Sequence, residues 1–262
     1  MNMKLSLTFA AMTALVAPAA MASTIVVDDF TAPGSIASNQ DGNPASLDVV
    51  GGMIGGNRYM WASSDALGPN FATTFEADGS GVITFNNNSG NTGQAVLVYD
   101  GGGVGAGFGF TFADLPAGVS NVIDVDVDGL GGIDFLEGDP VANRALSFSG
   151  SNFDTLPSNA TFRAYAWDTD GTLVEYEEVI GGPDFDSNLG LTSFTLTGGG
   201  NGAFDWTMVG ALAFSIESNT PNFDGTLGKI SVVPLPASAL LLLGGLGGLT
   251  AASRRRRKDR KA

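Results

Sequence analysis

Residues 161–167 read TFRAYAW, and the alternation within them decides the fold. Small or apolar side chains fall on one side of this segment and larger polar or aromatic ones on the other: Phe162, Ala164 and Ala166 against Arg163, Tyr165 and Trp167. A period of two residues is typical of a strand with one face on a core. Residues 108–112, FGFTF, repeat the pattern with phenylalanines on one side. Both segments predict β-strands.

Similar short segments continue along the middle of the chain, separated by turn clusters such as DGN, ADGSG and TGGGNG. These clusters are rich in residues that tolerate positive φ. The expected strands cover residues 24–30, 46–54, 57–64, 71–77, 81–86, 94–100, 107–112, 121–127, 144–150, 161–167, 172–180, 191–197, 210–218 and 227–233. Many short strands joined by glycine-rich turns predict an all-β fold over residues 23–232, an antiparallel β-sandwich of jelly-roll-like type.

The first 22 residues have the three parts of a secretory signal peptide. Lys4 precedes an apolar stretch from Leu5 to Val16, and small residues, Ala20 and Ala22, occupy the positions that a signal peptidase reads. We expect a signal helix within residues 1–22 and cleavage after Ala22. Ser23 then becomes the first residue of the mature chain.

Composition excludes several classes of site. The chain has no cysteine and no histidine, which removes disulfides, thiol chemistry, the Ser-His-Asp triad and His-ligated metals. Residues 23–233 hold 26 of the 27 acidic residues against four basic ones, which are Arg58, Arg144, Arg163 and Lys229. A surface this acidic repels nucleic acid, so no nucleic-acid partner is expected.

The C-terminus reads VVPLPASALLLLGGLGGLTAASRRRRKDRKA. Residues 235–252 are apolar and would form a helix of about 27 Å, which barely spans a bilayer core. We expect a single transmembrane helix there. A basic tail over residues 254–262 follows, and its cluster should stay cytoplasmic: Arg254, Arg255, Arg256, Arg257 and Lys258. With a signal peptide in front, the domain would face the periplasm.

This C-terminus, residues 233–262, resembles the VPLPA variant of the PEP-CTERM sorting signal of Gram-negative bacteria. The motif residues match letter for letter: Val233, Pro234, Leu235, Pro236 and Ala237. The resemblance implies that an exosortase, an integral-membrane protease, recognises and cuts the tail, and that the domain then reaches the cell surface or the extracellular polysaccharide matrix. We expect the membrane anchor to be transient, with cleavage near Pro236–Ala237. The likeness concerns sorting and implies no ligand.

Acidic turns are candidate calcium sites, because calcium prefers carboxylate and other oxygen ligands. One candidate is the DVDVDG segment, with Asp124, Asp126 and Asp128, which resembles the first half of an EF-hand loop. Its second half departs from that pattern, because Phe135 stands where the loop needs a bidentate glutamate. The alternative for this segment is a solvated acidic strand edge with an Asp-Gly turn. A second candidate follows from the expected fold, because jelly-roll sugar-binding modules often hold a structural calcium near their first and last strands. Here Asp28, Asp29 and Asp224 would serve.

Aromatic side chains could form a sugar platform. Tyr59 and Trp61 share one side of an expected strand, and Tyr165 and Trp167 share one side of another. Exposed Tyr and Trp rings stack on sugars, whereas buried ones simply pack a sheet. Both interpretations remain open from the sequence.

The leading hypothesis is an exported, non-enzymatic protein of the cell surface or matrix, processed by an exosortase and associated with exopolysaccharide. A carbohydrate-binding module with the aromatic platform is the first alternative. A polysaccharide hydrolase or lyase is the second, and it would need two carboxylates about 5–10 Å apart in a cleft.

Overall fold

The computed structural model describes residues 23–38, 45–64, 72–87, 92–102, 108–111, 122–153, 160–180, 182–199, 202–218 and 222–235. The expected signal helix and transmembrane helix lie outside these residues, as do Pro236, Ala237 and the basic tail. Within the described residues, no helix has the length and apolar character needed to cross a membrane.

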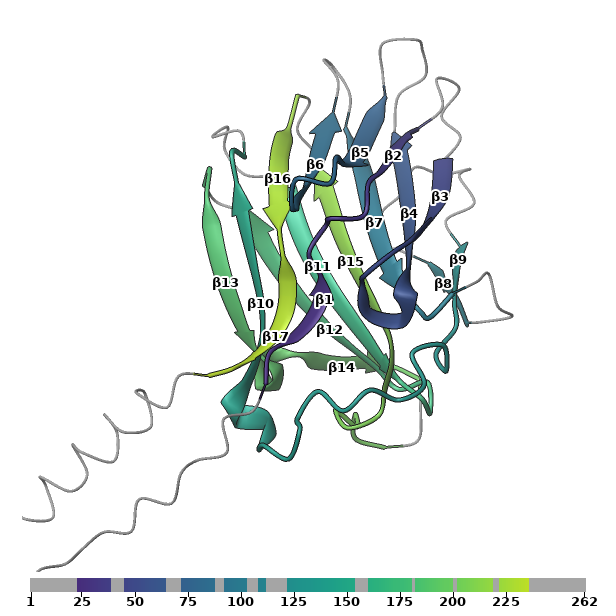
Figure 1. The fold of residues 1–262 in the computed structure, drawn as a ribbon, viewed down its shortest axis with the longest axis vertical. Coiled ribbons are helices and arrows are strands. Elements are labelled where there is room, and N and C mark those ends of the chain that lie inside the picture. Colours follow the sequence, from purple (N-terminus) through teal and green to yellow (C-terminus); the bar gives the residue numbers. More distant parts are fainter. Residues whose placement is uncertain are drawn as a thin grey trace, which may run out of the picture.

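Two antiparallel sheets face each other (Figure 1). The eight-stranded sheet has this order: β1 (Ile25–Asp28), β17 (Ile230–Pro234), β10 (Arg144–Ser151), β16 (Asp224–Gly228), β6 (Val82–Asn87), β5 (Thr73–Ala77) and β2 (Gly34–Ala37), with β13 (Phe185–Gly190) also on β10. The first strand thus lies beside the last, and β17 runs between β1 and β10.

The seven-stranded sheet packs against it in this order: β14 (Thr195–Gly198), β12 (Leu173–Ile180), β11 (Ala160–Asp168), β15 (Val209–Ser218), β7 (Gly93–Tyr99), β4 (Asn57–Ser64) and β3 (Ala45–Val50). A separate hairpin joins β8 (Phe108–Thr111) to β9 (Val122–Val125). Three short 3₁₀ turns complete the described elements: Ile54–Gly56, Val141–Asn143 and Leu191–Ser193.

The alternation in TFRAYAW works as the sequence predicts. Phe162, Ala164 and Ala166 enter the main core between the sheets, where the ring of Phe162 lies 4.3 Å from that of Phe148 in β10. Tyr165 and Trp167 point to the other side of β11. The predicted all-β, antiparallel sandwich is therefore confirmed.

The structure differs from the predicted strands at four places. β2 and β13 were not expected, because GSIA and the polar FDSNLG carry little alternation. Residues 191–193 form a 3₁₀ turn before β14, in place of one strand over 191–197. The expected strand over 227–233 is divided at Lys229 into the end of β16 and the start of β17.

A buried ion pair ties β1 to the opposite sheet. Arg58 in β4 donates to Asp28 Oδ2 at 2.6 Å, and the Tyr99 hydroxyl donates to the same oxygen at 2.8 Å. Arg58 and Asp28 are almost fully shielded from solvent, with 0% and 1% of their side chains exposed. Because losing either partner would leave a buried charge unpaired, this contact fixes the end of β1 against β4 of the opposite sheet.

Candidate functional site

The four aromatic candidates lie on the outer face of the seven-stranded sheet. Tyr59 and Trp61 project from β4, and Tyr165 and Trp167 from β11. The strands β7 and β15 separate the two pairs, which places them about 14 Å apart at a strand spacing of ~4.8 Å. Between them lie small apolar side chains: Val96, Val98, Ala211 and Ala213. The sequence predicted that the two rings of each pair share one side of their strand. The sheet places both pairs on the same face.

Most of these rings are packed away from solvent. Trp61, Tyr165 and Trp167 are 3–4% exposed and form a second apolar cluster with Val125 at the end of β9. Tyr165 and Trp167 stack with centroids 6.1 Å apart. Burial raises the pKa of the Tyr165 hydroxyl well above its ordinary value. Tyr59 alone of the four is partly exposed. In this structure the outer face is therefore a packed layer.

The same face becomes polar toward the other end of its strands. Arg163 donates to Glu177 at 2.9 Å and to Glu217 at 2.6 Å. Gln94 of β7 lies opposite Glu217 and is 1% exposed, and neither of its amide atoms has a hydrogen-bond partner among the residues that the structure describes. An unpaired buried amide is costly, and because Gln94 is 1% exposed, a ligand could supply its hydrogen bonds only if the side chains that cover it moved.

An open polar groove lies on the outer face of the eight-stranded sheet, where β10 changes partner. β10 pairs with β17 through Arg144–Ser147 and with β16 through Gly150 and Ser151. These registers leave Phe148 and Ser149 between the two pairings, opposite the break at Lys229. Gly228 permits the close approach, because a Cβ there would lie 2.7 Å from Ser149 Oγ. The division of the expected final strand thus creates the groove.

Hydroxyl, amide and ammonium groups line this groove. It has a volume of about 330 Å³, and its lining is Ser147, Phe148, Ser149, Ser187, Asn188, Lys229 and Ser231. Ser147 pairs in register with both Asn188 and Ser231, so these three side chains share the outer face. Lys229 and Ser149 are exposed. Sequence reasoning missed this site, because neither the strand break nor β13 was expected.

The calcium candidates are distributed over separate parts of the fold. Asp28 is engaged by Arg58 and Tyr99, and Asp29 accepts hydrogen bonds from the backbone and hydroxyl of Thr31. These bonds, the Thr31 hydroxyl first, lower the pKa of Asp29. Asp224 lies in β16, opposite Asn86 of β6.

The acidic residues of the DVDVDG segment lie in a strand and in the turn that follows it. Asp126 Oδ1 accepts the backbone N–H of Asp128 in a tight turn, and Asp124 belongs to β9. Across the described ranges, no group of three or more acidic side chains is arranged to hold a metal ion. Structural calcium stays a prediction.

The predicted sorting motif, residues 233–237, begins inside the sheet. Val233 and Pro234 end β17, where Pro234 lies opposite Arg144 of β10. The backbone N–H of Leu235 donates to the carbonyl of Asn143 at 2.7 Å. The first three motif residues are thus held against β10, and the expected cleavage position comes directly after them in the sequence.

Comparison with known proteins gives a loose structural likeness. No family model matches the chain, and no curated protein matches it. A family 11 carbohydrate-binding module from Clostridium thermocellum, solved with a β-1,3-1,4-mixed-linked tetrasaccharide, superposes with a TM-score of 0.35 and 12% identity over 81% of this chain and 96% of the other. The solution structure of CtCBM11 gives 0.38 and 12% over 83% and 99%. An exo-β-agarase gives 0.33 and 10% over 81% of this chain and 26% of its own. TM-scores and identities this low assign no function to this chain. Its function has to be inferred from its own geometry.

Proposed function

We propose that this protein is exported, is sorted through its C-terminal signal to the cell surface or matrix, and binds neutral polysaccharide there through the groove between β10, β13 and the β16–β17 break. The observation that carries the binding proposal is the groove lining. Hydroxyls and an amide exchange hydrogen bonds with sugar hydroxyls in either direction, and the Lys229 ammonium adds three donors.

The charge of the domain favours a neutral ligand. Residues 23–233 carry 26 acidic and four basic residues, so an acidic polysaccharide would be repelled over most of the surface. A volume of about 330 Å³ lies at the lower end of the range for small-ligand sites, which suits one or two sugar units of a longer chain. Affinity for a single segment should be weak, as expected for a wet, polar site.

A glycan array tests the binding proposal. The chain from Ser23 onward would be compared with Ser149→Phe, which fills the groove, and with Ser35→Phe, a matched change at an exposed serine of β2 in the same sheet. We expect neutral glycans to bind wild type and Ser35→Phe, and Ser149→Phe to lose binding. Retained binding in Ser149→Phe would overturn the proposal.

The aromatic and polar face of the seven-stranded sheet is the second candidate location for the same function. The unpaired amide of Gln94, beside Arg163 and Glu217, is the observation that favours it. Adding Gln94→Ala to the array distinguishes the two faces, because loss of binding in this variant alone would move the site to the seven-stranded sheet.

Intact mass tests the sorting proposal. Protein recovered from washed cell surface and medium should begin at Ser23 and end near Pro236. Protein that runs through Ala262 in those fractions would contradict cleavage by a sorting enzyme and would leave the tail as a lasting anchor.

A further inference from the structure

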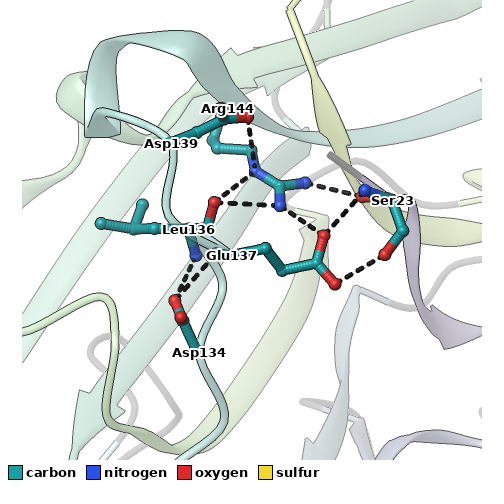
Figure 2. A network of polar contacts seen from close by, with 6 residues as sticks. All are labelled: Ser23, Asp134, Leu136, Glu137, Asp139 and Arg144. Atoms are coloured by element: carbon teal, nitrogen blue, oxygen red, sulfur yellow. Dashed lines mark hydrogen bonds and ion pairs between the residues drawn. The ribbon is translucent and has the colours of Figure 1, made fainter. Parts of the chain in front are cut away.

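A polar network holds Ser23 against the turn that precedes β10 (Figure 2). The Ser23 nitrogen donates to Glu137 Oε2 at 2.8 Å, and the Ser23 hydroxyl donates to Oε1 of the same carboxylate at 2.6 Å. The Ser23 carbonyl accepts a hydrogen bond from Arg144 Nη1 at 2.7 Å. Every polar group of this residue therefore has a partner more than a hundred positions away in the sequence.

The acceptor is held in place by contacts that do not involve Ser23. Asp134 Oδ1 accepts the backbone N–H groups of Leu136 and Glu137, which forms the turn. Glu137 has a φ of 46°, in the left-handed region, and this places its side chain beside Arg144. Arg144 is fully buried, donates to the Leu136 carbonyl through Nε and Nη2, and donates to Glu137 Oε2 at 2.7 Å.

The local charge is unbalanced in favour of a cation. Two carboxylates, from Glu137 and Asp139, pair with one guanidinium, at 2.7 Å from Arg144 Nη2 and 3.5 Å from Arg144 Nε respectively. A neutral peptide N–H at Ser23 leaves this excess negative charge uncompensated. An ammonium group with three donors would compensate part of it and would strengthen the contact with Glu137, because charge-assisted hydrogen bonds are the stronger kind.

We propose that Glu137 is a docking site for the free α-ammonium group of Ser23, which exists only after residues 1–22 are removed, and that Arg144 positions Ser23 through its carbonyl. Hydrolysis of the Ala22–Ser23 bond adds the hydroxyl of water to the Ala22 carbonyl carbon and a hydrogen to the Ser23 nitrogen. At neutral pH the new amine takes a further proton, since its ordinary pKa is about 7.7–8.0. Processing thus creates the ligand of a site that the domain already contains.

The site lies beside described residues that precede the expected C-terminal cleavage point in the sequence. Ile25 pairs with Val232, and Arg144 pairs with Pro234, so docking of Ser23 holds β1 along the edge of the strand that carries the first sorting-motif residues. Removal of the signal peptide therefore stabilises the sheet next to Val233 and Pro234. This inference is independent of what the groove binds.

Thermal unfolding of chains with defined N-termini tests the proposal. The chain beginning at Ser23 would be compared with the same chain N-acetylated and with one that retains Ala22, each in wild type, in Glu137→Gln, and in Glu76→Gln as an exposed control of equal charge change. We expect the free Ser23 amine to raise Tm by a few degrees over the acetylated form in wild type and in Glu76→Gln. In Glu137→Gln the difference should disappear.

The pH dependence provides a second readout that works even if Glu137→Gln folds poorly. The Glu137 carboxylate, which accepts from the Ser23 nitrogen, should raise the pKa of the docked amine above its unfolded value. The Arg144 guanidinium opposes this rise, but Arg144 is itself paired with both Glu137 and Asp139, so the net local charge stays negative. The extra stability is then fully present below the unfolded pKa and is lost as pH rises through the folded pKa. Equal Tm values for free and acetylated chains, or an amine pKa of about 7.7–8.0 by ¹⁵N NMR, would overturn the proposal.

Discussion

The outer faces of the two sheets differ in a way that composition does not reveal. The seven-stranded sheet carries Trp61, Tyr165 and Trp167, the side chains expected of a sugar platform, yet they are 3–4% exposed and packed around Val125. The eight-stranded sheet carries serines, which give no sign of a binding site in the sequence, yet they line an open groove. The type of a residue indicates whether it could bind a ligand, but its exposure to solvent determines whether a ligand can reach it.

Removal of the Trp167 side chain should have the largest effect of the changes that test this difference between the two faces. If the ring packs the sheet, Trp167→Ala should lower the free energy of unfolding by about 3–5 kcal/mol, as large-to-small changes in packed clusters do. Urea denaturation measures this loss. Glycan binding of the variant that remains folded should be unchanged. A small loss of stability together with abolished binding would reverse the roles of the two faces.

Removal of the groove amide should have a smaller effect, on affinity. Asn188→Ala should weaken binding of a neutral oligosaccharide by about fivefold, since a hydrogen bond contributes roughly 1 kcal/mol. Because Asn188 is exposed, the free energy of unfolding should change by less than about 0.5 kcal/mol. Calorimetric titration and urea denaturation provide both values. Unchanged affinity would show that the groove amide does not contact the ligand.

The smallest expected effect is on stability, from removing the charge of Glu175 on the outer face of the seven-stranded sheet. Desolvation raises the pKa of Glu175, which lies opposite Tyr165 in β11. A raised folded pKa means that stability is greatest below the unfolded pKa and falls as pH rises through the folded pKa. Glu175→Gln should therefore stabilise the protein slightly at pH 7, within about 0.5 kcal/mol, and the gain should vanish near pH 3. Destabilisation at pH 7 would indicate that the ionised form is the favoured one.

The sequence predicts the sandwich because apolar and polar residues alternate along most of its strands. TFRAYAW places Phe162 in the core and Trp167 on the outer face, as its period requires. The polar strand β13 has no such period, and its place depends on pairing with β10. Local pattern cannot reveal a strand that is specified by its partner.

The candidate sites were less predictable because they depend on long-range contacts. Asp28 looked like a calcium ligand in VVDDF, but its partner Arg58 is 30 residues away. Glu137 and Ser23 are 114 residues apart, and nothing in their flanking sequence indicates contact. One available signal was the scarcity of basic residues: with four arginines and lysines in residues 23–233, each was a candidate for a specific acidic partner.

Chemical-shift mapping with a bound neutral oligosaccharide tests the central claim most directly, because one spectrum reports on both faces. The account predicts that the shifts concentrate on the amides of Ser147, Ser149, Asn188, Lys229 and Ser231, while the indole N–H signals of Trp61 and Trp167 stay in place. Shifts centred on those indoles and on Gln94, with the groove unchanged, would contradict it.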